Sequence, residues 1–220
     1  MRVYSIFLSI DGEITFPCQG QFSTFLRLSG CNLNCEWCDT KKAQGMDSGI
    51  EMSVQEVFEV IKNIGCKKIT ITGGEPLLQV DSIYELIYIL KNWGAIVTVE
   101  TNGSILIPKF KNKDVPNSWI VDYKLPSSKM EEYMKIENFK NLWKNDIVKF
   151  VIDGREDYDK AVEVLKEVGI KDFVRKAFSP TPNLSSKVLV DWMKQDKLFQ
   201  VIVSLQLHKI IWPDANLEEV

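Results

Sequence analysis

The 220-residue chain is predicted to fold as one α/β domain with a mainly parallel sheet, in the form of a partial, incomplete β/α barrel. Short runs rich in β-branched and aromatic residues alternate with helix patterns, which is typical of βαβ units. No linker rich in Pro, Gly or Ser divides the chain. The chain is also shorter than the roughly 250 residues of a complete eight-unit barrel. One domain covering residues 1–220 is therefore expected.

Seven segments have the composition of β-strands. Residues 21–28 alternate between polar and apolar side chains. The other six runs cover residues 68–72, 96–100, 119–123, 147–152, 173–178 and 199–205. Because most of these runs are separated by helix patterns, we expect them to pair in parallel.

Four helix patterns lie between the strands. Ser53 and Glu56 form a capping box, and the helix that they begin ends before Gly65. The remaining three helices are predicted over about 81–94, 156–168 and 185–195. Residues 101–117 show no helix period, so one crossover is expected to be irregular.

The composition describes an ordinary globular protein, with 45% hydrophobic and 26% charged residues. A net charge of −3 and the absence of a dense Lys/Arg block argue against a nucleic-acid or anionic-membrane partner. No apolar run approaches the ~20 residues of a membrane span. The opening residues 1–10 are too short for a secretory signal. We therefore expect a cytoplasmic protein with reduced thiols, in which five cysteines suggest metal binding or catalysis.

Three of the cysteines lie in "SGCNLNCEWCDT", as Cys31, Cys35 and Cys38. They follow the first alternating strand and so belong to a loop at the carboxyl end of a strand, where α/β proteins place their chemistry. Thiolates suit iron–sulfur clusters. In a four-iron cluster, three thiolates leave one iron without a protein ligand, as a catalytic zinc site leaves one position for substrate.

A zinc site is the alternative, with its fourth ligand supplied by Asp39, His208 or a distant cysteine. Cys18 and Cys66 are far away in the sequence, and we expect them to be buried apolar residues instead of ligands.

The segment "CNLNCEWC" resembles the C-x3-C-x2-C signature of the radical S-adenosylmethionine (SAM) superfamily, including the aromatic Trp37 before the last cysteine. "TGGEP" (72–76), at the end of the next predicted strand, is similar to the GGEP motif of that superfamily. Paired glycines allow close approach of the backbone to a ligand, and Glu75 can accept a hydrogen bond from an ammonium group. The resemblance implies a [4Fe-4S] cluster and SAM, whose reductive cleavage produces a 5′-deoxyadenosyl radical that abstracts hydrogen from a substrate.

Within the superfamily the chain resembles the 7-carboxy-7-deazaguanine synthase family from about residue 5 to 212. The resemblance is carried by "FLSIDGE" (7–13), "FLRLSGCNLNCEWCDT" (25–40), "DYKLPSS" (122–128) and "LQLHKIIW" (205–212), together with "TGGEPLLQ" (72–79) and "ETNGS" (100–104). It implies conversion of the small molecule 6-carboxy-5,6,7,8-tetrahydropterin into 7-carboxy-7-deazaguanine with loss of ammonia, on the way to queuosine-type bases. It also implies regeneration of SAM, a requirement for Mg²⁺, an external one-electron reductant such as flavodoxin or ferredoxin, and a homodimer.

The same resemblance implies roles for particular residues. The cluster ligands are Cys31, Cys35 and Cys38, and a Mg²⁺ ligand is Thr40. SAM is bound by Trp37, Cys38, Asp39, Gly74, Glu75, Asp122, Tyr123, Lys124, Phe178, Ser179, Pro180 and Thr181. The substrate is bound by Ile10, Asp11, Gly12, Glu13, Arg27 and Thr72. The first four of these residues belong to an N-terminal substrate-binding segment, residues 1–20. Arg27 can hold the substrate carboxylate through two parallel hydrogen bonds.

Alternatives stay open for several of these residues. Arg27 could form a surface ion pair, Thr40 could cap a turn, and His208 could be a substrate contact or a core imidazole. Asp11 stands where the family commonly has Gln, and Asp122-Tyr123 replaces its usual Ser-Pro. Residues 213–220 are expected to be a solvated acidic tail. A glycyl-radical-enzyme activating protein and a non-catalytic zinc protein are the rival functions.

Overall fold

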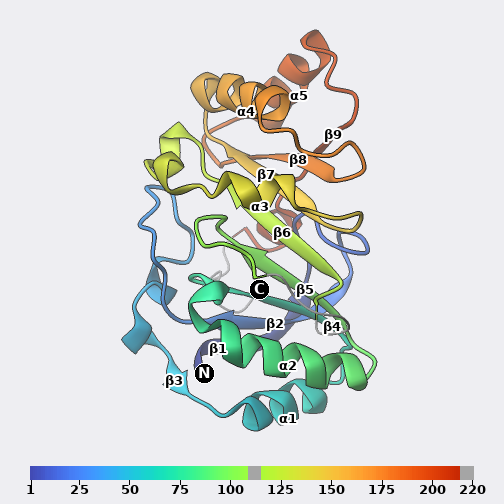
Figure 1. The fold of residues 1–220 in the computed structure, drawn as a ribbon. Helices are drawn as coiled ribbons and strands as arrows, with labels where there is room; N and C mark the ends of the chain where they lie inside the picture. The colour runs from blue at the N-terminus through green and yellow to red at the C-terminus, as the bar shows by residue number, and fades with distance from the viewer. Residues whose placement is uncertain (109–114, 214–220) are drawn as a thin grey trace.

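The computed structural model describes residues 1–108 and 115–213, which form an open nine-stranded sheet (Figure 1). The strand order is β3-β1-β2-β4-β5-β6-β7-β8-β9. The strands are β1 (Arg2–Ile10), β2 (Phe22–Leu28), β3 (Ile50–Glu51), β4 (Lys68–Gly73), β5 (Ile96–Thr101), β6 (Ser118–Tyr123), β7 (Ile147–Ile152), β8 (Arg175–Pro180) and β9 (Val201–Val203). From β2 to β9 every neighbouring pair is parallel, whereas β1 is antiparallel to both β2 and β3. The predicted partial barrel with a mainly parallel sheet is therefore confirmed.

Helices α1 to α5 lie on one face of the curved sheet, and α6 lies on the other (Figure 1). The helices are α1 (Val54–Ile64), α2 (Val80–Asn92), α3 (Ile136–Lys140), α4 (Arg155–Glu167), α5 (Ser186–Gln195) and α6 (Leu207–Ile211). Single 3-10 turns cover Lys41–Ala43, Met46–Ser48, Pro76–Gln79, Pro126–Ser128 and Glu131–Tyr133. In the described part of the chain, no helix has both the length and the apolar character needed to span a membrane.

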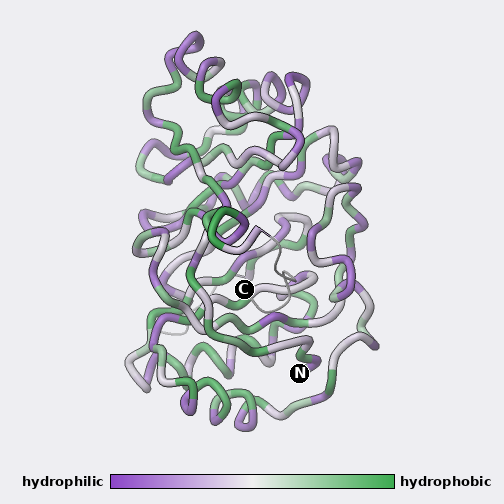
Figure 2. The backbone as a smooth tube through the Cα atoms, turned by 180° about the vertical axis from the view of Figure 1, so that it is seen from behind, coloured by the Kyte–Doolittle hydropathy of each residue, from purple (hydrophilic) through white to green (hydrophobic). Residues whose placement is uncertain are grey.

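Helix α1 begins and ends where local chemistry requires it. The Ser53 hydroxyl accepts from the Glu56 N–H at 3.2 Å, and the Glu56 carboxylate accepts from the Ser53 N–H at 2.7 Å. Gly65 ends the helix in the left-handed region, at φ 82°. Hydrophobic and hydrophilic residues alternate along the helix (Figure 2), and Val57 and Ile61 are fully buried. The predicted capping box is confirmed.

The sheet has an apolar core on its helix-covered face and a much smaller one on the opposite face. The larger core joins the inward residues of the strands to helices α1 to α5. The smaller one consists of Ile14, Ile120, Ile147 and Ala177. Ile14 belongs to residues 11–21, which cross the sheet between β1 and β2. On the sheet face opposite helices α1 to α5, apolar packing is thus confined to this small cluster, and polar side chains can occupy the rest of the face.

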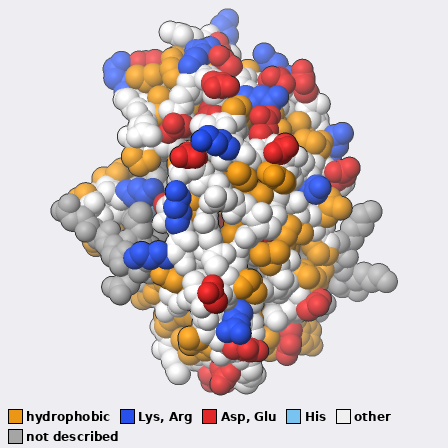
Figure 3. Space-filling model, turned by 90° about the vertical axis from the view of Figure 1, so that its left-hand side faces the viewer, with side chains coloured by type: hydrophobic (Ala, Val, Ile, Leu, Met, Phe, Trp, Pro, Cys, Tyr) orange, Lys and Arg blue, Asp and Glu red, His pale blue; other side chains and the backbone are white. Residues whose placement is uncertain are grey.

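Some elements differ from the sequence expectations. Strand β1 and the short elements β3, α3 and α6 were not predicted, and the strand expected over 199–205 is only Val201–Val203. Residues 102–108 contain no helix, in agreement with an irregular crossover, but 109–114 lie outside the described residues, as do 214–220 of the predicted tail. On the side of the molecule shown in Figure 3, basic and acidic side chains are intermixed with hydrophobic ones.

Candidate active site

A cavity of about 420 Å³ lies on the sheet face opposite helices α1 to α5. Most of the sequence-predicted site residues line it together: Ile10, Asp11, Gly12, Glu13, Arg27, Cys31, Cys35, Trp37, Cys38, Asp39, Thr40, Thr72, Gly74, Asp122, Lys124 and Thr181. Five others are not in its lining: Glu75, Tyr123, Phe178, Ser179 and Pro180. Segments far apart in the sequence thus meet in one site.

The strand register explains this selection. Arg27 of β2 lies beside Thr72 of β4, and Asp122 of β6 lies beside Lys149 of β7. Because successive side chains of a strand point to opposite faces, the residue after Asp122 points to the helix side. Tyr123 indeed packs there against Phe139, with ring centroids 5.0 Å apart.

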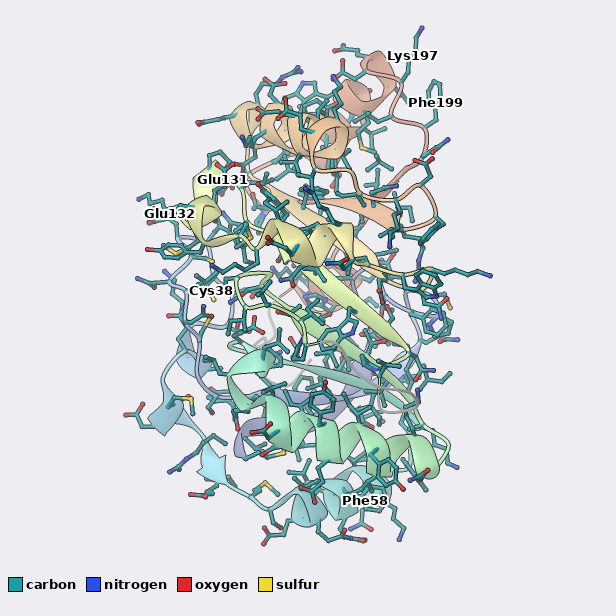
Figure 4. All side chains as sticks on the ribbon, in the orientation of Figure 1. Cys38, Phe58, Glu131, Glu132, Lys197 and Phe199 are labelled. Atoms are coloured by element: carbon teal, nitrogen blue, oxygen red, sulfur yellow. The ribbon has the colours of Figure 1, made fainter. Side chains whose placement is uncertain are left out.

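The cysteine loop leaves β2 at its carboxyl end and is held by backbone hydrogen bonds. Gly30 N–H donates to Ala43 O at 2.8 Å, and Cys31 N–H donates to Gln44 O at 2.9 Å. All five cysteines are free thiols. Cys38, labelled in Figure 4, and Cys31 are half-buried, and Cys35 is buried. The Cys18 side chain is exposed, so the expectation that it is a buried apolar residue was wrong; Cys66 is half-buried.

The three loop thiols fit an iron–sulfur cluster. All three border the cavity, so a ligand held between them would still have an open side. Among the described residues, no three His, Cys, Asp or Glu side chains are gathered closely enough to hold a single metal ion. Burial raises the pKa of Cys31, and it raises the pKa of Cys35 to about 11, so these thiols stay protonated until a metal displaces the proton. Three thiolates beside an open cavity are a ligand set suited to an iron–sulfur cluster.

The glycine pair of the "TGGEP" segment packs directly on the cysteine loop. Gly73 adopts a φ of 135°, which side chains rarely tolerate, and its α-carbon faces the Leu28 backbone. A Cβ at Gly74 would collide with the backbone of Gly30. The Glu75 N–H then donates to Gly30 O at 2.7 Å. The glycines therefore allow the ends of β2 and β4 to meet beside the cavity.

Glu75 is fully buried and uses its carboxylate inside the protein. One oxygen accepts from Leu77 N–H at 2.9 Å and from the Thr101 hydroxyl at 2.8 Å, and the other accepts from Asn102 N–H at 2.7 Å. Burial raises the pKa of Glu75, while these donors oppose the rise. The side chain therefore fastens the end of β5 to the end of β4.

Alternating charges at the end of β6, on β7 and in residues 11–21 line the cavity. Glu13 pairs with Lys149 at 2.6 Å, and Asp122 pairs with Lys124 at 2.8 Å. Burial alone would raise the pKa of Glu13, but Lys149 lowers it to about 2. Burial opposes the charge of Lys149, yet its acidic neighbours, beginning with Glu13, raise the pKa of the ammonium. Both groups are held ionised.

Arg27 is placed to receive an anion. In the described part of the structure its buried Nε has no hydrogen-bond partner, and its guanidinium lies 5.6 Å from the centre of the Phe7 ring. Nearby, the Thr72 hydroxyl donates to Glu100 at 2.9 Å. Burial raises the pKa of Glu100. An unpaired cationic donor and a carboxyl group therefore face the same space.

The floor of the cavity is a buried polar cluster around Asp11. Its carboxylate forms an ion pair with Lys68 and accepts from the Thr70 hydroxyl at 3.1 Å, which in turn lies 2.9 Å from Ser23 Oγ. Burial lowers the pKa of Lys68 to about 8. Asp11, which stands where the family commonly has Gln, is thus paired with the buried cation of Lys68.

His208 also borders the cavity, and the segment that carries it covers residues 10–13. Leu207 N–H donates to Gly12 O at 2.8 Å, and a Cβ at position 12 would collide with the His208 imidazole. Burial lowers the pKa of His208. The imidazole therefore belongs to the site and not to the apolar core.

No site role was predicted from the sequence for several residues that line the cavity: Glu100, Asn102, Lys149 and Gln206. Lys149 had a signal, because it is a charged residue inside an otherwise apolar strand run, and Glu100 opens the segment "ETNGS" that carries the family resemblance. Such a charge in a strand that is covered on one face indicates a polar space on the other. Gln206, which donates to Glu13, lies in the segment "LQLHKIIW" that carries the family resemblance, but no role was predicted for it.

The comparisons with known proteins agree with this geometry. Residues 26–180 match the model of the radical SAM superfamily. The chain is 42% identical to a 7-carboxy-7-deazaguanine synthase of Clostridium acetobutylicum, with 96% of each chain covered, and 35% identical to one of Koribacter versatilis, with 96% of this chain and 97% of the relative covered. The crystal structure of QueE from Escherichia coli has the same fold, with a TM-score of 0.75, 20% identity and 94% of each chain covered. The chain belongs to the radical SAM superfamily and, within it, to the 7-carboxy-7-deazaguanine synthase family.

Proposed function

We propose that the chain converts 6-carboxy-5,6,7,8-tetrahydropterin into 7-carboxy-7-deazaguanine, with loss of ammonia. The observation that carries this proposal is one cavity that is bordered both by three cysteines and by Arg27, whose buried Nε has no hydrogen-bond partner in the described part of the structure. Full-length relatives named as this synthase support it. The rival functions, a glycyl-radical-enzyme activating protein and a zinc protein, have no comparable support.

The residues of this chain fit a carboxylated, nitrogen-rich bicycle. The Arg27 guanidinium is the natural partner of the substrate carboxylate, since its fork can donate two parallel hydrogen bonds. Glu100 and Asp11 offer acceptors for ring N–H groups. Glu13, held ionised by Lys149, adds a further acceptor and stays charged at neutral pH. These groups orient the substrate before any bond changes.

Cys31, Cys35 and Cys38 would hold the cluster, and the loop around Trp37 with the backbone at Gly74 would border SAM. When bound, this pair of cofactors supplies radical chemistry that removes a hydrogen atom from the substrate. Trp37 is fixed for such a role, because its indole N–H donates to the Ser127 hydroxyl at 2.9 Å. The protein contributes position and exclusion of water.

Glu75, Tyr123 and the 178–180 segment contribute to the SAM site indirectly in this proposal. Tyr123 and Phe178 pack on the helix side of the sheet and support the neighbouring residues that do face the cavity. Thr181, at the end of that segment, is held by Asp153. The strand ends that would border the cofactor are therefore held in position by packing on the helix side of the sheet.

Thr40 is proposed as a Mg²⁺ ligand. Its hydroxyl borders the cavity 3.6 Å from Cys38 Sγ, and Mg²⁺ commonly takes few protein ligands while it keeps waters and substrate oxygens. We also propose an external one-electron reductant of the flavodoxin or ferredoxin type, a homodimer and a cytoplasmic location. Each is an expectation from the family resemblance.

One incubation tests the reaction. Anaerobically reconstituted, reduced protein is mixed with 6-carboxytetrahydropterin, SAM and Mg²⁺, and the products are separated by chromatography. We expect 7-carboxy-7-deazaguanine and ammonia in equal amounts, with SAM not consumed. A cluster-loaded protein that cleaves SAM and yields no deazaguanine would contradict the proposal.

The magnesium role has its own test. Thr40→Ala is expected to reduce turnover at limiting Mg²⁺ by about tenfold, because the loss of one ligand weakens metal binding by roughly 1–2 kcal/mol. Thr40→Ser keeps the hydroxyl and should therefore show the same turnover at limiting Mg²⁺ as the wild type. Reductive SAM cleavage without substrate serves as the control. An equal loss of both activities in Thr40→Ala would argue for a structural hydroxyl instead.

A further inference from the structure

The Asn102 side chain reaches the cysteine loop from the end of β5. Asn102 directly follows Thr101, is buried, and borders the cavity. Its amide nitrogen lies 3.8 Å from Cys31 Sγ, within reach of a hydrogen bond to sulfur. The Leu33 backbone N–H donates to the same sulfur at 3.4 Å. Two N–H donors therefore converge on one of the three cysteines.

The orientation of the Asn102 amide follows from its partners. Its oxygen receives the Ser104 backbone N–H at 3.0 Å and the Ser104 hydroxyl at 2.6 Å. A backbone N–H can only donate, so the atom that it meets must be the amide oxygen. The NH₂ end must then be the one that faces Cys31.

Three side chains close a ring that locks this orientation. The Ser104 hydroxyl donates to Asn102, the Asn32 amide donates to Ser104 Oγ at 2.8 Å, and the Asn102 amide donates to Asn32 Oδ1 at 3.1 Å. Each hydroxyl or amide in the ring donates once and accepts once. The amide of Asn102 has two hydrogens, so one remains for the sulfur while the other completes the ring.

We propose that Asn102 donates a hydrogen bond to the Cys31 thiolate of the bound cluster and thereby raises the cluster's reduction potential. The inference rests on the proposed function, which supplies the cluster. Reduction adds one electron from the external reductant to the cluster and increases the negative charge on its sulfur ligands. An N–H donor stabilises that charge, and hydrogen bonds to sulfur are one of the means by which proteins set the potentials of such clusters.

Asn32 and Ser104 are positioning residues in this arrangement. Without the Ser104 hydroxyl the amide keeps one donor to its oxygen, the backbone N–H, and loses the ring. Ser104→Ala should therefore shift the potential in the same direction as removal of the amide, by a smaller amount.

The test is a potentiometric titration of anaerobically reconstituted protein, without SAM, followed by electron paramagnetic resonance and with dithionite as reductant. Asn102→Leu removes the donor without adding charge. We expect its reduction equilibrium to become several-fold to tenfold less favourable, and tenfold is about 59 mV for one electron. Ser104→Ala provides the second variant should Asn102→Leu not hold the cluster.

Asn138→Leu is the matched control. Asn138 is also buried and binds the same loop, donating to Gly103 O at 3.1 Å and Ile105 O at 2.8 Å, but these contacts are to backbone and not to sulfur. Its potential should equal that of the wild type. An unchanged potential in both test variants, or an equal shift in Asn138→Leu, would overturn the inference. Wild-type protein without about four irons per chain would contradict the proposed function itself and remove the inference with it.

Discussion

Arg27 shows how one side chain reveals the ligand that a site is built for. Its buried Nε has no hydrogen-bond partner among the described residues, and an unpaired buried donor costs free energy unless a bound group satisfies it. The neighbouring Glu100 is bonded to Thr72 and does not neutralise the arginine at hydrogen-bond distance. The proposed function assigns the carboxylate of the substrate to Arg27 as its partner.

Arg27→Lys separates the charge from the two-pronged geometry. The lysine keeps a cation but has no fork, so we expect kcat/KM for the pterin to fall about 10-fold to 100-fold, mostly through KM, which corresponds to about 1.5–3 kcal/mol. Steady-state kinetics at saturating SAM provide the measurement, and the affinity for SAM serves as the control. Unchanged kinetics in Arg27→Lys would mean that the carboxylate binds elsewhere.

Glu13 connects the site to stability. Its pKa is lowered from 4.5 to about 2, so its ionised form stabilises the fold above the ordinary pKa, and this stabilisation is lost as pH falls from about 4.5 to 2. At about 1.4 kcal/mol per unit the difference is about 3 kcal/mol. Glu13→Gln should therefore be less stable by about this amount at pH 7.

The measurement for Glu13 is chemical unfolding across a pH series. The difference between Glu13→Gln and wild type should shrink below pH 4.5, where the wild type loses its advantage. Glu59→Gln, which replaces an exposed carboxylate on α1, is the control and should change stability little. A difference that is constant from pH 7 to pH 3 would show that the ion pair with Lys149 is not its source.

The junction between β4 and β5 depends on Glu75, whose carboxylate joins the "TGGEP" segment to the residues after β5. In Glu75→Gln one carboxylate oxygen is replaced by an NH₂ group, which cannot accept the hydrogen bonds that this oxygen now receives from the Leu77, Thr101 or Asn102 donors. We expect a loss of about 1–3 kcal/mol in the free energy of unfolding and weaker SAM binding. Thermal unfolding and equilibrium dialysis with SAM provide the measurements. If Glu75→Gln binds SAM more weakly but unfolds at the same temperature as the wild type, Glu75 contacts SAM directly.

Elements with local signals were predictable from the sequence, and elements that depend on distant partners were not. Helix α1 carries its own capping box and terminal glycine, so its limits could be predicted. Strand β1 was missed because its half-buried residues show no clean alternation, and it is defined by pairing with β2. The five-residue helix α6 depends on contact with Gly12, about 195 residues earlier in the chain.

The same division applies to the site. The cysteine and glycine motifs are contiguous, so the resemblance located them. Lys149 and Glu100 enter the cavity only because the register of neighbouring strands brings them beside Asp122 and Thr72. Conversely, contiguous ranges such as 122–124 include residues that the two-residue period of a strand sends to the other face, as it does Tyr123.

Across the whole molecule, the two ends of the described chain close the site together. Residues 11–21 lie over the sheet, and residues 205–209 lie over them. Gln19 donates to Gly12 O at 2.8 Å and to Leu205 O at 2.6 Å, which ties the two segments to each other. The cavity-lining groups of both segments therefore depend on contacts between segments that are distant in the sequence, which include the hydrogen bond from Leu207 N–H to Gly12 O.

Gly12→Ala tests this dependence. The added Cβ would collide with both the ring and the backbone of His208, so the C-terminal segment has to move away from residues 10–13. We expect a several-fold to 100-fold rise in KM for the pterin, with iron content retained, because the cysteine loop is held by its own backbone hydrogen bonds to Ala43 and Gln44 and meets the C-terminal segment through the exposed Asp39–Lys209 pair. Gly154→Ala is the matched control, since a Cβ there meets nothing within 4 Å. If Gly12→Ala binds the pterin as the wild type does, the two segments do not form the substrate site as one unit.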